Sequence, residues 1–492
     1  MLRLSIIHIL ALMPAALIAG GAPRNAVFIL ADDLGWGELG CYGQEKIRTP
    51  NIDRLAAEGA RFTHHYSGAP VCAPARCVLM TGKHLGHAEI RGNLQATRNF
   101  PHFKEGQHPI TDASFTLAER FKAAGFATAA MGKWGLGPVG STGDPNRQGF
   151  DLFFGFNCQA LAHSFYPEFL WKNDRRVRIN GKAIPGHARQ PEGTVRMEDW
   201  IGGTYASASI LEEALGFIDA HAEVPFFLYL PFTEPHVAMH PPIESVNEYP
   251  EQWDDKPYRG ESGYLPHPRP RAGYAAMISD LDRHVGRVVA KLRENCILDE
   301  TLIIFTSDNG TTHRADGAQF GVGGVDAAFF HSTSGLKGFK GSVYEGGLRV
   351  PMIVRYPPAV KAGALNTSPG YFADWFPTLC AAFGLEAPAG LDGENLWPAI
   401  TGAPAITDRK PMVWVYPEYG GQVAVRIGDF MVLRRNLKAG KIQPWEAYDI
   451  PGDAVQANNL AAERPDLIAK AVEILKQQTD SNPLFNLEIP ER

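Results

Sequence analysis

The amino-acid sequence predicts an α/β protein: a large, mainly parallel sheet flanked by helices, with a small C-terminal subdomain of antiparallel strands plus one helix. Short apolar, β-branched runs alternate with amphipathic helical stretches over most of the chain. Several of these runs lead into charged or amide side chains. From about residue 411, successive short strand-like segments replace the alternation. With 492 residues and 45% hydrophobic content, the chain can form one large domain and a smaller one.

Four apolar runs share a feature at their carboxyl ends, where each leads into residues with polar chemistry. In open α/β sheets, ligands bind outside the carboxyl ends of the strands, so we expect these side chains to meet at one edge. The runs and the residues after them are 26–30 with Asp32 and Asp33, 128–131 with Lys133, 226–230 with His236, and 302–305 with Asp308 and Asn309.

Between these runs, apolar residues at helical spacing predict the helices that cover the sheet. The predicted helices span residues 51–58, 114–124, 205–221 and 274–294. Weak periodicity and many turn residues predict long surface loops at 164–198 and 241–271. Further on, strands are expected at 412–416, 423–427, 430–434 and 445–450, with a helix at 465–478. The predicted units are a large domain over 23–405 and a C-terminal α+β subdomain over 406–492.

The first 22 residues have the pattern of a secretory signal peptide, which we assign to residues 1–22. Arg3 precedes an apolar run over 4–18, and small residues follow at 19–22. A membrane anchor is the alternative, but the run is shorter than the roughly 20 residues that a spanning helix needs, and Pro14 interrupts it. We therefore expect an exported protein, periplasmic or secreted, without a membrane span.

Charge and cysteine content argue against other classes of protein. The formal net charge of −6, without a basic block, gives no general attraction to nucleic acid. The six cysteines lack the paired spacing of zinc sites. Export permits disulfides, but six cysteines in so long a chain do not make a disulfide scaffold.

The residues after two of the runs, Asp32 with Asp33 and Asp308 with Asn309, offer only oxygen ligands. Hard oxygen donors suit calcium or magnesium rather than zinc, and a cage made wholly of protein oxygens favours calcium. Taken singly, each pair is explained as well by a helix cap or a turn. Two such pairs at the ends of comparable strands favour a metal site.

Between these pairs, residues 72–83 have the pattern of a helix that a glycine ends, with Cys72 at its N-terminus. Pro74 fits a first helical turn, where free backbone N–H groups and the helix dipole favour an anion. Arg76 adds a planar, fork-shaped donor. An isolated cysteine is more often a small buried hydrophobe, so Cys72 alone does not establish chemistry.

The segment CAPAR at residues 72–76 matches the CxPxR signature of type I sulfatases, a formylglycine-dependent family in the alkaline phosphatase superfamily. The resemblance covers the chain from about residue 25 to 355. The other matching segments are ADDLGWG (31–37), TPNIDRLAAEG (49–59), GKW (132–134), PH (235–236), TSDNG (306–310) and KGSVYEGG (340–347). The segments AYDI (447–450) and NL (459–460) resemble the C-terminal subdomain of that family.

This resemblance implies one calcium ion and a nucleophile made when maturation machinery oxidises Cys72 to formylglycine. One hydroxyl of the hydrated aldehyde would attack sulfur, and proton loss from the second would expel sulfate, an exit that an ordinary Ser or Cys lacks. His236 would protonate the leaving alcohol. The implied calcium ligands are Asp32, Asp33, Asp308, Asn309 and an oxygen of modified Cys72, and the implied sulfate-binding residues are Arg76, Lys133, His236 and Lys340.

One position departs from the family's pattern. Many members have GKWH, whereas Gly135 follows GKW in this chain, so a histidine often assigned to formylglycine turnover is absent. The candidates for its role are His87, His163 and His313.

The resemblance implies hydrolysis of a sulfate monoester, with a sulfated carbohydrate as substrate. The segments GKWGLG (132–137) and GFNCQ (155–159) are similar to bacterial carbohydrate sulfatases, some of which act on 4-sulfated galactose or N-acetylgalactosamine. Two other functions stay open: a phosphatase or phosphonate-ester hydrolase on the same fold, and a non-catalytic glycan-binding protein. Aromatic residues in the predicted loops that offer faces for sugar rings are Trp171, Trp200, Tyr166, Phe165, Trp253 and Tyr258.

Overall fold

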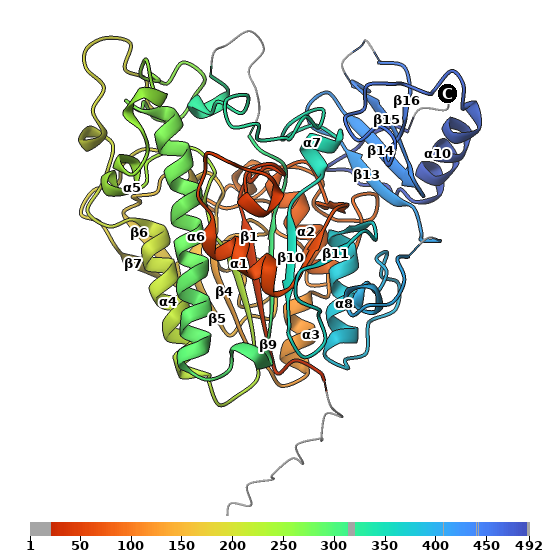
Figure 1. Ribbon diagram of the computed structural model, residues 1–492, viewed down its shortest axis with the longest axis horizontal. Helices are drawn as coiled ribbons and strands as arrows, with labels where there is room; N and C mark the ends of the chain where they lie inside the picture. Colours follow the sequence, from red (N-terminus) through yellow and green to blue (C-terminus); the bar gives the residue numbers. More distant parts are fainter. Residues whose placement is uncertain (1–20, 313–319, 407, 439, 441, 490–492) are drawn as a thin grey trace, which may run out of the picture.

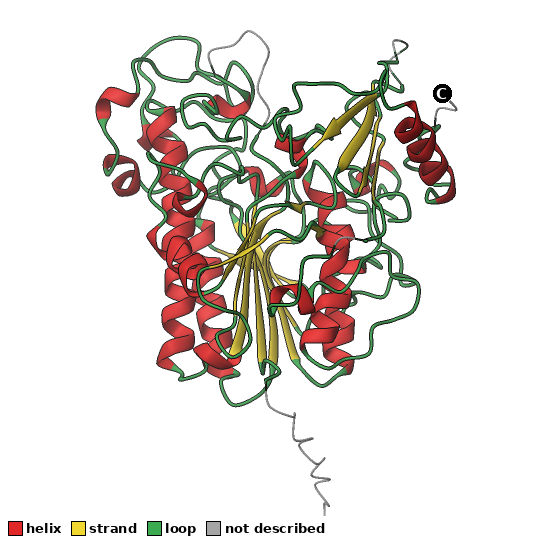
Figure 2. Ribbon diagram, turned by 45° about the vertical axis from the view of Figure 1, so that its right-hand side comes forward, coloured by secondary structure: helices red, strands yellow, loops and turns green. Residues whose placement is uncertain are grey.

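A computed structural model describes residues 21–312, 320–406, 408–438, 440 and 442–489 (Figure 1). Nearly all of the predicted signal peptide, and also His313, lie outside the described residues. One large sheet forms the centre of the molecule, with helices on both of its faces (Figure 2). A small C-terminal sheet lies at the upper right in Figure 1. The predicted fold class is therefore confirmed.

The large sheet has ten strands in the order β11-β2-β10-β9-β1-β8-β4-β5-β6-β7. Its central strands β9, β1, β8, β4 and β5 are parallel, so their carboxyl ends lie along one edge. The strands are β1 (Asn25–Ala31), β2 (Ala60–Phe62), β4 (Ala127–Lys133), β5 (Leu152–Phe156), β6 (Phe169–Lys172), β7 (Arg175–Arg178), β8 (Phe226–Pro231), β9 (Thr301–Ser307), β10 (Met352–Arg355) and β11 (Ala364–Asn366). Two short strands, β3 (His65–Tyr66) and β12 (Gly370–Tyr371), pair separately.

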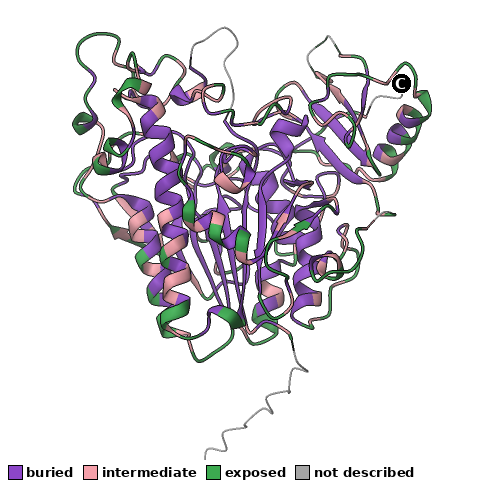
Figure 3. Cartoon of the chain, viewed as in Figure 1, coloured by how far each residue is buried: buried purple, intermediate pink, exposed green. Residues whose placement is uncertain are grey.

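Alternating side chains of β1 enter the two apolar cores, one on each face of the sheet. Val27 and Ile29 belong to the core that α1, α4 and α6 cover, and Phe28 and Leu30 to the core under α2, α3 and α8. A strand covered on both faces needs apolar residues throughout, and Figure 3 shows the sheet as buried. The helices are α1 (Pro50–Glu58), α2 (Cys72–Thr81), α3 (Leu117–Ala123), α4 (Ala206–Ala220), α5 (Ile243–Asn247), α6 (Pro270–Glu294), α7 (Glu345–Leu348), α8 (Trp375–Ala382) and α9 (Trp397–Ile400). No helix in the described part of the chain is long and apolar enough to cross a membrane.

Two segments predicted as loops contain regular structure. The hairpin β6–β7 lies within 164–198, and α5 lies within 241–271. The prediction was wrong there because strands of four residues and a helix of five are too short to show a periodic hydrophobic pattern. Helix α3 begins at Leu117 rather than at residue 114, because Thr116 caps it by accepting a hydrogen bond from the backbone N–H of Glu119 at 3.2 Å.

The C-terminal subdomain is a four-stranded antiparallel sheet in the order β13-β14-β15-β16, with α10 packed on one face. Val413 and Val415 of β13 contribute to the core with α10, whereas Met412, Trp414 and Tyr416 join the core of the large domain. The elements are β13 (Met412–Tyr416), β14 (Gln422–Ile427), β15 (Phe430–Arg435), β16 (Glu446–Asp449) and α10 (Pro465–Gln477).

Trp414 connects the two sheets. Its indole Nε1 donates a hydrogen bond to the carbonyl of Ser67 at 3.0 Å. The hydroxyl of Ser67 in turn donates to the carbonyl of Asp308, just beyond β9. Because Trp414 is fully buried, its side chain contributes both packing and a satisfied polar contact. Two hydrogen bonds thus connect the C-terminal sheet to the end of the central strand β9.

We expect Trp414→Ala to lower the free energy of unfolding by about 3–5 kcal/mol, the usual cost of removing a large buried aromatic side chain. Urea unfolding followed by circular dichroism measures the loss. The matched control is Trp397→Ala, because Trp397 is only partly buried and a clearly smaller loss is expected. Equal losses in the two variants would show that Trp414 has no special role in joining the sheets.

Candidate active site

The carboxyl ends of the central strands continue their pairing for one residue beyond the sheet. Ala31 of β1 is in register with Ser307 of β9, and the N–H of Asp308 then donates to the carbonyl of Ala31 at 3.0 Å. On the other side of β1, the N–H of Asp32 donates to the carbonyl of Glu234 at 3.0 Å. The polar residues that follow the strands are therefore held side by side by backbone hydrogen bonds.

Four of these residues form one buried group: Asp32, Asp33, Asp308 and Asn309. The N–H of Asp33 donates to Asp308 Oδ1 at 3.1 Å, and Asn309 Nδ2 donates to Asp33 Oδ1 at 2.7 Å. Asn309 Oδ1 is buried and has no hydrogen-bond partner among the described residues. A buried, unpaired carbonyl oxygen beside three carboxylates is a donor set suited to a hard cation.

Cys72 is the first residue of α2 and is only 1% exposed. Its Sγ lies 3.4 Å from Asp32 Oδ1 and 3.5 Å from the Nζ atoms of both Lys133 and Lys340. Burial raises the pKa of the Cys72 thiol well above its usual value, nearby aspartates raise it further, and the two lysines offset this only in part. Cys72 is therefore a neutral thiol here, although a helix N-terminus alone favours the thiolate.

Each carboxylate has a buried cation as its partner. Burial disfavours both charged forms, but in the pair of Asp32 with Lys133 the opposite charges outweigh it, lowering the pKa of Asp32 and raising the pKa of Lys133. The closest contacts are Lys133 Nζ to Asp32 Oδ2 at 2.5 Å, Lys340 Nζ to Asp33 Oδ2 at 2.8 Å, and Arg76 Nη2 to Asp308 Oδ2 at 2.7 Å. The pair of Asp32 with Lys133 is consequently ionised, whereas burial and the charge of Asp32 raise the pKa of Asp308 to about 6 despite its contact with Arg76.

Arg76 differs from the two lysines because its N–H groups bond a carboxylate and a backbone carbonyl, whereas each lysine Nζ also lies beside Cys72 Sγ. Its Nε also donates to Asp308 Oδ2, at 3.1 Å, and its Nη1 donates to the carbonyl of Lys133. The planar guanidinium thereby connects the end of β9 to the end of β4. Arg76 therefore positions Asp308, in addition to any contact that it makes with an anion.

His236 follows β8 and presents one ring nitrogen to the site. Its Nδ1 donates to the carbonyl of Val237 at 2.5 Å, which leaves Nε2 only 3.6 Å from Asp33 Oδ2. Burial and the nearby lysines lower the pKa of His236 well below its usual value. The ligand-type atoms of one cluster lie within 4.8 Å of one another, and they belong to Asp32, Asp33, Cys72 and His236.

Of the two candidate histidines that lie within the described residues, only His163 lies beside His236. His163 stacks on His236, with ring centroids 5.1 Å apart and an interplanar angle of 11°. His87 instead pairs with Asp392 at 2.9 Å. Because Asp392 also bonds the carbonyl of residue 82, just beyond α2, His87 lies at the opposite end of that helix from Cys72. His313 lies outside the described residues.

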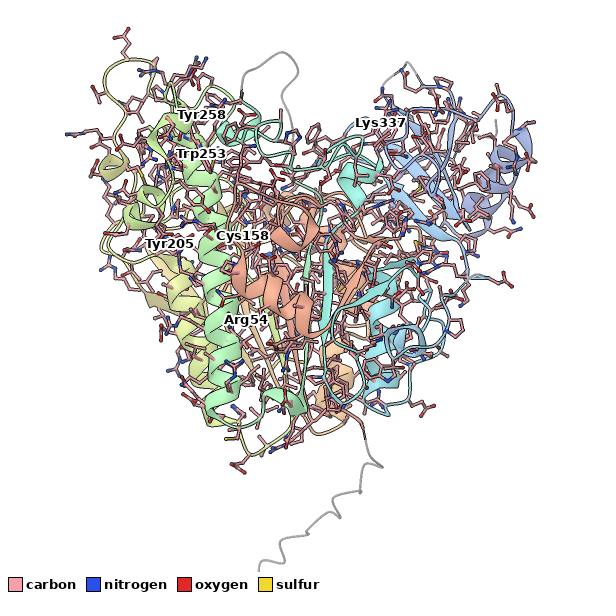
Figure 4. The ribbon with its side chains drawn as sticks, in the orientation of Figure 1. Arg54, Cys158, Tyr205, Trp253, Tyr258 and Lys337 are labelled. Carbon is pink, nitrogen blue, oxygen red and sulfur yellow. The ribbon has the colours of Figure 1, made fainter. Side chains whose placement is uncertain are left out.

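The space beside Gly135 is filled by Gln159. Gly135 has φ +82°, and a Cβ there would lie 2.8 Å from Gln159 Nε2. Gln159 is 5% exposed, and its Nε2 has no hydrogen-bond partner in the described chain. Our sequence analysis did not propose Gln159 as a site residue. The sequence signal that could have indicated Gln159 was its position just after β5, whose Phe156 pairs with Lys133. Figure 4 labels the neighbouring Cys158.

Three of the six aromatic residues predicted as sugar-binding faces are buried, and Trp171, Trp200 and Trp253 are partly buried. Phe165 and Tyr166 pack on Tyr205, and Trp253 packs on the aromatic rings around it. Tyr258 is also buried. Figure 4 labels Tyr205, Trp253 and Tyr258 on the side of the molecule that contains α6. A loop sequence without periodicity does not reveal which aromatic side chains point inward, and the buried Phe165, Tyr166 and Tyr258 are unavailable to a ligand in this structure.

Known proteins resemble this chain over most of its length. A family model described as Sulfatase matches residues 24–385, and one described as N-sulphoglucosamine sulphohydrolase, C-terminal, matches residues 338–481. The chain is 32% identical to N-acetylgalactosamine-6-sulfatase of Canis lupus familiaris over 429 residues, which cover 82% of this chain and 70% of that protein. It is 30% identical to steryl-sulfatase of Mus musculus over 452 residues, which cover 80% of this chain and 68% of that protein.

Solved structures share the fold. Ps i-CgsB in complex with k-i-k-neocarrahexaose matches with a TM-score of 0.75 and 25% identity, over 96% of this chain and 95% of that chain. A phosphonate monoester hydrolase of Agrobacterium radiobacter matches with a TM-score of 0.63 at 20% identity, a likeness of fold alone. Because the Sulfatase model spans residues 24–385 and these relatives cover most of the chain, the chain belongs to the sulfatase family and is a sulfuric ester hydrolase.

Proposed function

We propose that this sulfatase hydrolyses a sulfate monoester on a sugar, using a formylglycine nucleophile made from Cys72 and calcium held by the carboxylate cluster. The observation that carries the proposal is the setting of Cys72. Its Sγ lies 3.5 Å from two lysine Nζ atoms and 3.4 Å from a carboxylate oxygen, at the buried N-terminus of α2. Such a position suits a nucleophile that must act on a bound anion.

Calcium fits the donor chemistry of the cluster. Asp32, Asp33 and Asp308 supply hard carboxylate oxygens, and Asn309 Oδ1, which lacks a partner within the described residues, supplies a neutral one. We propose these residues and an oxygen of modified Cys72 as its ligands, in a family that generally uses calcium. When bound, calcium supplies positive charge that stabilises an adjacent oxygen nucleophile and the sulfuryl oxygens.

Oxidation of Cys72 would replace a thiol that is poorly ionised in this site. The hydrated aldehyde supplies one hydroxyl for attack on sulfur and a second whose proton loss expels sulfate. Within the segment CAPAR, Pro74 and Arg76 fit the pattern that the maturation machinery recognises, whereas Cys77 has neither residue at those offsets. The machinery as a partner, and export directed by residues 1–22 to the periplasm or the exterior, belong to this proposal.

The other site residues take roles that follow from their atoms. Lys133 and Lys340 bind sulfuryl oxygens, because their Nζ atoms already lie beside Cys72 Sγ. His236 donates a proton to the leaving alcohol through Nε2, the nitrogen that faces the site, from its imidazolium form, because the neutral ring has its only proton on Nδ1. The negative charge of a bound sulfate ester favours that form. Arg76 holds Asp308 in place and adds positive charge. With calcium bound, the three cations leave the site net positive, which suits a singly charged sulfate monoester.

A sugar as the alcohol is supported by two likenesses, to N-acetylgalactosamine-6-sulfatase and to Ps i-CgsB bound to neocarrahexaose. We therefore propose sulfated galactose or N-acetylgalactosamine as the substrate class. The main alternative is a phosphatase, but a phosphate monoester carries more negative charge, and two-metal phosphatases need a second ligand set near the first. The other metal-type cluster in the described part of the chain is His84 with His87 and Asp392, near the far end of α2.

We expect Asp308→Asn to lose bound calcium, measured by inductively coupled plasma mass spectrometry, because it removes one carboxylate charge while keeping the side-chain shape. Sulfate release should fall at least about 100-fold. The matched control is Asp326→Asn, since Asp326 also pairs with an arginine but outside the cluster, and it should retain both properties. Full calcium content in Asp308→Asn would contradict the assigned site.

Peptide mass spectrometry of protein from a maturation-competent host should find an aldehyde or its hydrate at Cys72 and an unmodified thiol at Cys77. Cys77 therefore serves as a control within the same peptide region. In a host whose machinery oxidises only cysteine, Cys72→Ser should fold and bind calcium but fail to turn over. Fully active enzyme with only a thiol at Cys72 would exclude this mechanism.

The enzyme should release sulfate from 4-sulfated or 6-sulfated N-acetylgalactosamine or galactose much faster than phosphate from matched phosphate esters. The reason is that the chain belongs to the sulfatase family and that its site, with calcium bound, is net positive and suits the single negative charge of a sulfate ester. Ion chromatography of released sulfate and phosphate gives kcat/KM for each ester. A preference for the phosphate esters would favour the phosphatase alternative.

A further inference from the structure

A turn of the C-terminal subdomain is held close to Cys72. This turn, residues 417–421, joins β13 to β14. Glu418 Oε1 accepts a hydrogen bond from the N–H of Asn93 at 2.9 Å. Asn93 Oδ1 accepts another from the N–H of Ala73 at 3.0 Å, and Ala73 directly follows Cys72 in α2. Two hydrogen bonds therefore connect the turn to the first helical turn that carries the nucleophile.

The far end of the same turn is held beside Lys340. Gln422, the first residue of β14, donates from Nε2 to the carbonyl of Gly341 at 2.7 Å. Its Oε1 accepts from the N–H of Val343 at 3.3 Å. Both contacts fall within three residues of Lys340 in the chain. The turn is thus fixed between the segment that carries the nucleophile and the segment that carries a sulfate-binding lysine.

Tyr419 is the aromatic residue that this turn presents. It is 52% exposed, unlike the other aromatic residues of β13 and its turn, and it stacks on Tyr416 with ring centroids 5.9 Å apart at 26°. Its backbone has φ 49°, a left-handed conformation that costs free energy in a residue with a bulky side chain. The hydrogen bonds at both ends of the turn hold this residue near the site, and partial burial raises the pKa of its phenol while the charge of Lys340 lowers it.

Tyr264 has the same unusual backbone in the large domain. Its φ is 64°, and its ring contacts His236 at a centroid distance of 5.8 Å and His187 at 4.4 Å. Its N–H donates to His187 Nδ1 at 3.1 Å. Burial raises the pKa of its phenol, and the charges of Lys340 and Asp33 act on this ring as they do on Tyr419. Two strained tyrosines, one from each subdomain, therefore lie near the same charged groups.

We propose that Tyr419 and Tyr264 form two aromatic walls of the subsite for the sugar ring that carries the sulfate ester, a step that rests on the proposed function. Aromatic faces bind the apolar C–H faces of pyranose rings, whereas the charged groups bind the sulfate. Strained backbone conformations concentrate at ligand-binding positions, where the gain on binding offsets their cost. The two tyrosines thereby determine preference for a sugar ring without taking part in the chemistry.

The test compares wild-type holoenzyme with Tyr419→Ala, Tyr419→Phe and Tyr264→Ala on 4-sulfated and 6-sulfated N-acetylgalactosamine. Each alanine variant should raise KM about tenfold with kcat within about twofold of wild type, and Tyr419→Phe should keep the wild-type KM because the ring face remains. Inorganic sulfate, which has no ring, should inhibit all variants with the wild-type constant. The matched control is Phe115→Ala, which removes another exposed aromatic side chain, near α3.

The outcomes separate this inference from the function on which it rests. An unchanged KM in both alanine variants, or a change in inhibition by inorganic sulfate of the same size as the change in KM, would overturn the aromatic subsite while the proposed function stands. Loss of bound calcium or of thermal stability together with the higher KM would also overturn it, because the effect would then be structural. A wild-type enzyme that releases no sulfate from any sulfated sugar would overturn both.

Discussion

The structure depends on keeping three carboxylates and three cations buried together at one edge of the sheet. Burial of an unpaired charge costs several kcal/mol, so each of the three carboxylates needs its own cation. The partners come from different strands: Asp32 and Asp33 follow β1, Lys133 ends β4, and Asp308 follows β9. The charges compensate each other only if those strands end at the same level. The strand register and the sheet order are therefore fixed together with the pairing of these charges. Arg76 connects the ends of β4 and β9 directly.

Much of this arrangement is visible in the sequence because it is local. An apolar run followed at once by Asp32 and Asp33, or by Asp308 and Asn309, defines both a buried strand and the residues at its carboxyl end. Parallel strands then place those ends on one edge without knowledge of the strand order. The position of Cys72 at a helix N-terminus is local in the same sense. Its protonation is not, because burial and neighbouring aspartates outweigh the helix dipole and raise the pKa of the thiol.

Other features depend on contacts between distant segments, and no short-range pattern contains them. Gln159 fills the space beside Gly135 only because β4 and β5 pair in one particular register. Tyr264 and Tyr419 have left-handed backbones, which the conformational propensity of tyrosine disfavours, and the N–H of Tyr264 bonds to His187, a residue remote in sequence. Gly420 and Gly421 after Tyr419 indicate a turn, but not what the turn faces. The hairpin β6–β7 is too short for its periodicity to stand out.

The burial of α2 constrains the order in which the chain folds and Cys72 is oxidised. Every residue of this helix is buried, and Cys72 itself is 1% exposed. An oxidising enzyme that recognises Pro74 and Arg76 must take this stretch of chain into its own active site. In the native state this stretch is inaccessible, since Arg76 is bound to Asp308 and Asn93 connects the turn of the C-terminal sheet to Ala73, the neighbour of Cys72. Under the proposed mechanism, oxidation must come before folding. Folding and maturation then compete in time, and a chain that folds first is trapped as the inactive thiol.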